Sequence, residues 1–178
     1  VAESPRKLLD LVEQKEQEFL KNKESIVSII PELNILQDRG ENHPTSKLYE
    51  GYKGVKVILD DVLKEMEGVS KKEYYVYSAT ELSEDMNKAY PNFTKARIKK
   101  KINVKAISLA EGGKTHGLDE RRWLGTKDKS ATFIIIYENK CAFISRDIKG
   151  KPVGVIIENK MIYETQKIIF LKPWMMLK

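Results

Sequence analysis

Three patterns of apolar and polar residues follow one another along the chain. From Pro5 to about Gln37, apolar residues recur at helical spacing, which predicts one long amphipathic helix. Arg39 to Ser46 is polar and is interpreted as a loop. Beyond it, short β-prone runs alternate with helical stretches, and a group of closely spaced β-prone runs follows. The pattern predicts an α/β domain at 46–178, preceded by a helical arm at 1–38.

The arm carries its apolar residues in a heptad pattern, in which Lys15 and Asn22 occupy two core positions. Pro31 removes one helical hydrogen bond, so a kink or a break is expected near Ile30. The helix could fold back on its own domain, or it could pair with a second copy of the chain. Pairing is preferred, because a helix of this length is too long for a compact domain to cover. The residues predicted to form this homodimer interface are Leu8, Val12, Phe19, Ile26 and Leu33.

The domain is expected to contain strands separated by helices, followed by an antiparallel meander. The first strands are predicted at Ser46–Glu50, Glu73–Ser78 and Ile102–Leu109, with helices at Gly54–Met66 and Glu81–Lys101. This alternation implies a largely parallel sheet in the first half. The meander is predicted at Ala131–Tyr137, Cys141–Arg146 and Val153–Ile157, before a helix that runs to about Trp174. The intervening Ala110–Lys129 is expected to be a loop, and loops of this length are often functional.

Composition excludes several classes of protein. Hydrophobic residues make up 41% of the 178 residues and charged residues 33%, as in a globular protein with a charged surface. No apolar run is long enough to span a membrane, and the first residues do not show the pattern of a signal peptide. The single cysteine, Cys141, cannot form an internal disulfide, which favours a cytoplasmic location. Since Val1 is not an initiator methionine, the chain is expected to be a fragment of a longer protein.

The net charge of +6 is concentrated in a run of five cations between Lys95 and Lys101. Such a run is typical of a solvated helix C-terminus, where the helix dipole favours positive charge. It is also compatible with a phosphate-binding patch, although no aromatic residue is interleaved with the lysines. The sequence leaves both interpretations open.

The segment Tyr49-Glu50-Gly51-Tyr52-Lys53-Gly54-Val55 predicts a turn from a strand into a helix, with free backbone N–H groups beside Glu50. Together with Asn139-Lys140, the run Pro152–Ile157 and a closing helix that carries Trp174, this segment is similar to the TrmB-like family of transcriptional regulators. The similarity extends over essentially the whole chain. It implies a phospholipase-D-like mixed sheet with flanking helices, acting as the effector domain of a regulator. The resemblance further implies that DNA is bound only by a winged helix-turn-helix head, expected upstream of Val1.

A phospholipase-D-like fold raises the question of catalysis. That chemistry needs a histidine, a lysine two residues later and an aspartate five residues after that. Ala131, Phe133 and Glu138 stand at the matching positions, so the chain is predicted not to be an enzyme. The two histidines, His43 and His116, are interpreted as surface residues, and no metal or cofactor is predicted. A nuclease of the phospholipase D type is the least favoured function.

A binding site is predicted where Glu50, Ser78 and the loop at Ala110–Lys129 should converge, since both strands end at the same edge of the sheet. The loop supplies His116, Arg121 and Arg122, which suit a small polar or anionic effector. Each residue also has a structural interpretation, with Glu50 and Ser78 capping a helix or turn and the arginines as surface charges. The two favoured functions are therefore a ligand-sensing domain and a pure interaction or dimerisation module.

Overall fold

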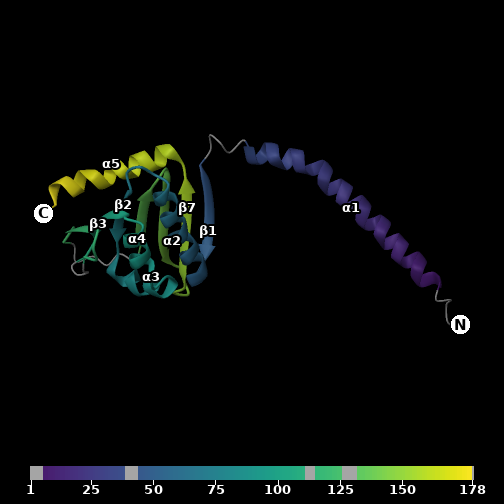
Figure 1. Ribbon diagram of the computed structural model, residues 1–178, viewed down its shortest axis with the longest axis horizontal. Coiled ribbons are helices and arrows are strands. Elements are labelled where there is room, and N and C mark those ends of the chain that lie inside the picture. The colour runs from purple at the N-terminus through teal and green to yellow at the C-terminus, as the bar shows by residue number, and fades with distance from the viewer. Residues whose placement is uncertain (1–5, 39–43, 111–114, 126–131, 178) are drawn as a thin grey trace. The chain divides into compact units, whose positions relative to one another are not determined.

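The computed structural model describes residues 6–38, 44–110, 115–125 and 132–177. The chain divides into two compact units, Val1–His43 and Pro44–Lys178 (Figure 1). Across the described ranges, no helix combines the length and the hydrophobicity needed to cross a membrane.

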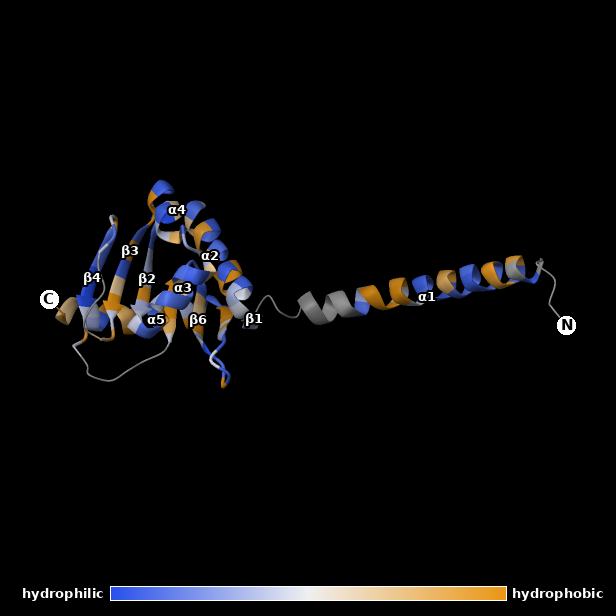
Figure 2. Cartoon of the chain, turned by 90° about the horizontal axis from the view of Figure 1, so that it is seen from below, coloured by the Kyte–Doolittle hydropathy of each residue, from blue (hydrophilic) through white to orange (hydrophobic). Residues whose placement is uncertain are grey.

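The first unit consists of one helix, α1 (Arg6–Asp38), which continues through Pro31 without the break considered above. Its apolar residues recur along its length (Figure 2). Val12, Phe19 and Ile26 are all exposed, by 56%, 72% and 62%. The side chains of Leu8 and Leu33, also predicted at the interface, lie outside the described residues.

The second unit is built on a seven-stranded mixed sheet in the order β1-β7-β6-β5-β2-β3-β4. Strands β2, β3 and β4 are parallel to one another, and every other neighbouring pair is antiparallel. The strands span Thr45–Glu50 (β1), Glu73–Ser78 (β2), Asn103–Ser108 (β3), Asp119–Trp123 (β4), Phe133–Tyr137 (β5), Lys140–Arg146 (β6) and Pro152–Glu158 (β7). The helices span Gly51–Glu67 (α2), Ser83–Ala89 (α3), Phe93–Lys99 (α4) and Lys160–Met176 (α5), with a 3-10 turn at Thr80–Leu82 (η1). The predicted α/β fold with flanking helices is confirmed.

Alternation along the strands sends side chains to two separate cores, one on each face of the sheet. On β2, Tyr74 and Val76 pack under α2, whereas Tyr75 faces α5 and lies against Phe170. Helix α2 contributes six buried apolar side chains at helical spacing, each worth on the order of 1.5–3 kcal/mol of burial. Figure 1 shows α2, α3 and α4 on one side of the sheet and α5 on the other. The site described below lies on the face covered by α3 and α4.

Three features differ from the sequence prediction. Strand β1 pairs with β7 in antiparallel fashion, so the parallel part of the sheet excludes it. The segment Asp119–Trp123, expected within a loop, forms the edge strand β4. The helical stretch expected at Glu81–Lys101, with a bend at Pro91, is fully interrupted at residues 90–92 and forms the two short helices α3 and α4; Pro91 lacks a backbone N–H and favours this interruption.

The two glycines after Tyr49 are required by the backbone where β1 turns into α2. Gly51 has φ of +69°, a conformation that residues with a Cβ rarely adopt. A Cβ on Gly54 would lie 2.8 Å from the carbonyl carbon of Tyr49. Glu50 occupies the N-cap position, but its side chain makes no capping hydrogen bond. The glycine pattern at this junction is therefore explained by a tight turn, and neither glycine needs a ligand to account for it.

Candidate ligand pocket

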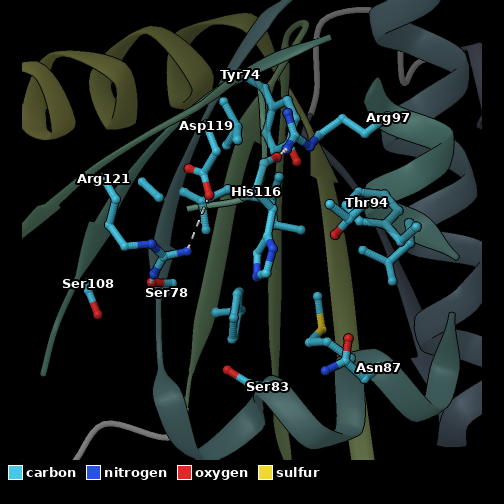
Figure 3. A pocket seen from close by; sticks show the side chains of 18 of the residues that line it. Tyr74, Ser78, Ser83, Asn87, Thr94, Arg97, Ser108, His116, Asp119 and Arg121 are labelled. Carbon is cyan, nitrogen blue, oxygen red and sulfur yellow. Dashed lines mark hydrogen bonds and ion pairs between the residues drawn. The ribbon is translucent and has the colours of Figure 1, made fainter. Parts of the chain in front are cut away.

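A cavity of about 300 Å³ lies between the sheet and the helices α3 and α4 (Figure 3). Its floor comes from β2, β3, β4 and β5, where Val76, Ala106 and Ile135 are neighbours in the strand register. Its roof includes Met86 and Asn87 of α3 and Phe93 and Thr94 of α4. The volume is at the lower end of the range for small-molecule sites.

Buried polar contacts hold the roof in place. Asp85 of α3, which is 5% exposed, accepts hydrogen bonds from Arg146 Nε of β6 at 2.8 Å and from Tyr52 Oη of α2 at 3.1 Å. Arg146 also donates to the carbonyl oxygen of Glu81 at 3.1 Å. Because α3 has only seven residues, these contacts supply anchoring that its own hydrogen bonds cannot.

Asp119 and Arg121 both point from β4 toward the same side of the sheet and line the cavity. Arg121 Nη1 donates to Ser78 Oγ at 3.0 Å, and Arg121 Nη2 lies 3.8 Å from Asp119 Oδ2. The side chain of Arg121 is only 16% exposed and that of Asp119 only 5%. Nevertheless, Asp119 Oδ1 and Arg121 Nε are buried with no hydrogen-bond partner among the described residues. Unpaired buried atoms of charged groups are costly to a fold.

A second arginine of the cavity, Arg97, is fully engaged. It is 3% exposed, and its guanidinium donates to four carbonyl oxygens, those of Ile102, His116, Gly117 and Leu118, at 2.8 to 3.3 Å. Gly117 and Leu118 both have positive φ, of 49° and 33°. Arg97 thereby fixes the turn that leads into β4 and sets the position of Asp119.

Tyr74 lines the cavity beside Arg97 and Asp119. Burial raises the pKa of Tyr74; Arg97 opposes this shift and Asp119 adds to it. The phenol therefore stays protonated at physiological pH and remains a possible hydrogen-bond donor. Among the described residues, no three histidine, cysteine, aspartate or glutamate side chains gather in a way that could hold a metal ion.

Three of the five predicted ligand-binding residues line this cavity: Ser78, His116 and Arg121. Figure 3 shows the imidazole of His116 pointing into it. Glu50 does not join them. Strands β1 and β2 run in the same direction, as predicted, but β7, β6 and β5 lie between them, which separates them by roughly 19 Å.

Arg122 also lies elsewhere, because neighbouring residues of a strand face opposite sides of the sheet. Its guanidinium stacks over the ring of Trp174 at 4.5 Å. It also donates to the carbonyl oxygens of Trp174 and Leu177, the latter at 2.6 Å. Arg122 therefore caps the end of α5 and does not contribute to the pocket.

The sequence pattern does not identify Asp119, Tyr74 or Arg97 as pocket residues. Asp119 falls in a predicted loop, since Asp-Glu-Arg-Arg-Trp carries no apolar alternation. Arg97 stands within the run of cations at 95–101, for which the sequence favours a solvated helix end or a phosphate-binding patch. Neither interpretation holds for Arg97, because it is buried. The neighbouring Lys100 pairs with Glu67, while Lys99 and Lys101 are exposed.

Neither a search against protein-family models nor a search of curated proteins returns a match. Solved structures do match. One is TrmBL2, an archaeal chromatin protein, with 17% identity over 97% of this chain and 68% of that chain, and a TM-score of 0.46. A phospholipase D family member, Nuc from Salmonella typhimurium, matches with 16% identity over 76% of this chain and 97% of its own, at 0.48. NucT from Helicobacter pylori matches with 12% identity over 76% and 98% of the two chains, at 0.49.

Proposed function

We propose that residues 46–178 form the effector domain of a TrmB-like transcriptional regulator and that the cavity binds its small ligand. The observation that supports this proposal is the pair Asp119 and Arg121, whose buried Oδ1 and Nε atoms have no partner in the described chain. A purely structural cluster would be expected to satisfy these groups internally. A ligand that completes them would bind the folded state only and would stabilise it.

A melting-temperature screen against common metabolites tests this function. At least one compound should raise the melting temperature of the wild type and should fail to do so for Arg121→Met. A suitable control is Glu120→Gln, which changes an exposed carboxylate of the same strand. If no compound shifts the wild type, or if Arg121→Met responds as the wild type does, the cavity is not an effector site.

We further propose that 1–38 is a dimerisation arm, so that the chain acts as a homodimer. Support comes from Val12, Phe19 and Ile26, which lie seven residues apart on α1 and are all exposed. Isolated apolar stripes of this kind are stabilised by pairing with another helix. Phe19→Glu combined with Ile26→Glu should therefore give a monomer in analytical ultracentrifugation. Lys21→Glu combined with Ser28→Glu, which changes the same helix beside the stripe, should remain a dimer. A dimeric Phe19→Glu, Ile26→Glu variant would place the interface elsewhere.

We also propose that the domain is catalytically inactive. Phe133 lines the cavity from β5, at a position where the phospholipase D reaction would need a lysine. Ala131, the position that would need the histidine, lies outside the described residues. Hydrolysis of an activated phosphodiester should not exceed the buffer background. Turnover that Phe133→Ala abolishes would contradict this proposal. If the cavity binds no compound while the chain still dimerises, the alternative of a pure interaction module becomes the better account.

A further inference from the structure

The two atoms left without a partner in the cavity have opposite requirements. Asp119 Oδ1 can only accept hydrogen bonds, and Arg121 Nε can only donate one. They belong to side chains of opposite charge, whose nearest charged atoms are 3.8 Å apart. A ligand that satisfies both atoms therefore needs a donor and an acceptor side by side.

The charges restrict this ligand further. An anion alone would suit Arg121 but would approach the Asp119 carboxylate and leave its Oδ1 without a donor. A cation alone would suit Asp119 but would be repelled by Arg121 and by the nearby Arg97. A molecule that carries one positive and one negative group on the same carbon atom can pair with both residues at once. Such pairing matters because buried charges are stabilised only when they are paired.

The rest of the cavity indicates what this molecule carries besides its charges. Met86, Phe93 and Phe133 line it from three different elements, and Leu59 from α2 adds a fourth apolar wall. The floor is also apolar at Val76 and Ala106. Polar side chains of the roof, such as Ser83 and Asn87, lie across the cavity from Asp119 in Figure 3. The region beside the charged pair thus suits an apolar group of moderate size.

Building on the proposed effector function, we propose that the ligand is a free α-amino acid with an apolar side chain. Its ammonium group donates to Asp119 Oδ1, and its carboxylate accepts from Arg121 Nε. In an α-amino acid both charged groups are attached to the same carbon atom, which fits the close spacing of the Asp119 carboxylate and the Arg121 guanidinium. The side chain then lies against Met86, Phe93 and Phe133. A cavity of about 300 Å³ accommodates a side chain of the size of leucine or phenylalanine.

Calorimetric titration of the whole chain with L-leucine and L-phenylalanine tests this proposal. The deaminated acid and the decarboxylated amine of leucine serve as probes that each lack one charged group. Both should bind at least about tenfold more weakly than leucine, since each leaves one buried charge unpaired. If either analogue binds as tightly as leucine, the two-point recognition is wrong.

The variant Asp119→Asn gives a readout that a purely structural role would not change. It should weaken leucine binding by about tenfold or more, while the deaminated acid binds as well as before or better. Glu120→Gln should leave both affinities unchanged. Loss of both ligands in a folded Asp119→Asn protein would overturn the assignment of the ammonium group to Asp119.

The failure of this inference can be distinguished from a failure of the effector function. If a sugar, nucleoside or phosphate ester raises the melting temperature through Arg121 while no amino acid does, the amino-acid proposal falls and the effector function stands. If no compound of any class binds, both fall.

Discussion

Two clusters of polar side chains lie on the same face of the sheet, and they differ in how completely they are paired. In the first, Lys140 Nζ donates to Asp61 at 3.1 and 3.2 Å and to Glu65 at 3.1 Å, and Tyr137 Oη donates to Asp61 at 2.8 Å. In the second, Arg121 donates to Ser78 and forms a distant ion pair with Asp119, and each of these two charged groups keeps an atom with no partner among the described residues. Both clusters contain acidic and basic side chains, but only in the second do charged groups keep atoms without a hydrogen-bond partner among the described residues.

This difference separates a structural role from a binding role. The paired cluster joins α2 to β5 and β6, and every contact links two elements of the fold. The open cluster links β4 to β2 through the hydrogen bond from Arg121 to Ser78, and its charged residues line a cavity. Proteins commonly give up stability at binding sites, because groups poised for a ligand are not optimally paired without it.

Breaking the paired cluster should have the largest effect on stability. Lys140→Met leaves Asp61 and Glu65 close together with no cation between them. The free energy of unfolding should fall by about 1–3 kcal/mol, less than for a fully buried pair because the two carboxylates are partly exposed. Urea denaturation measures this loss. Lys88→Met, which removes an exposed ion pair with Glu84, should cost far less, because solvent screens exposed pairs. Equal losses in the two variants would show that pairing at Lys140 is not structural.

Alkaline pH should weaken the fold by a smaller amount, through Lys140 and through Cys141 in the core on the α5 face of the sheet. Burial raises the pKa of the Cys141 thiol from 9.0 to about 11. Burial lowers the pKa of Lys140, but its hydrogen bonds to Glu65 and Asp61 outweigh this effect and raise the pKa above 10.5. As the pH rises, the Cys141 thiol loses its proton at a lower pH in the unfolded chain than in the folded chain. The stability that the protonated thiol provides is therefore lost between pH 9.0 and about 11. The contribution of Lys140 is complete below pH 10.5 and is lost as the pH rises through its higher folded pKa.

Urea denaturation at pH values from about 8 to about 11 should therefore show a decline on the order of 1–2 kcal/mol. Cys141→Ala should remove the part that falls between pH 9.0 and about 11. Asp119→Asn should leave the slope as in the wild type. A wild-type stability that does not change over this range would contradict the assignment.

Changing the open cluster should have the smallest effect on stability. Arg121→Met combined with Asp119→Asn removes both charges together and leaves no uncompensated ion. The free energy of unfolding should stay within about 0.5 kcal/mol of the wild type or should rise, since replacing a poorly paired buried ion pair is often neutral or stabilising. Differential scanning calorimetry without ligand measures this change. A loss as large as that of Lys140→Met would show that Asp119 and Arg121 hold the fold together.

Much of the fold follows from local sequence pattern, whereas the composition of the site does not. Helix α2 and strand β3 are predicted because their apolar residues repeat at periods of 3.6 and roughly 2. Strand β4 is not predicted because it is an edge strand composed almost entirely of charged residues. Ser78, His116 and Arg121 can be predicted as ligand-binding residues, because Ser78 ends a strand and the two others fall in a predicted loop.

The errors at the site arise from pairings that are remote in the sequence. The sequence predicts Glu50 beside Ser78 because both end strands that run in the same direction, but β1 lies at the far edge of the sheet next to β7. It groups Arg122 with Arg121 in a loop, whereas both lie in strand β4, which turns them to opposite faces of the sheet. Asp119 and Arg97 acquire their roles only through this three-dimensional arrangement, so no local pattern identifies them.

The Nε–H resonance of Arg121 in a ¹H–¹⁵N NMR spectrum tests the central claim most directly. This proton belongs to the unpaired donor itself, and Arg121→Lys identifies its signal by removing it. Addition of L-leucine should shift the resonance and slow its exchange with water, because the ligand carboxylate then accepts the hydrogen bond. Asp119→Asn should require at least about tenfold more leucine for the same shift. If the resonance stays in place at saturating concentrations of both L-leucine and L-phenylalanine, neither ligand completes the cluster, and the account is contradicted.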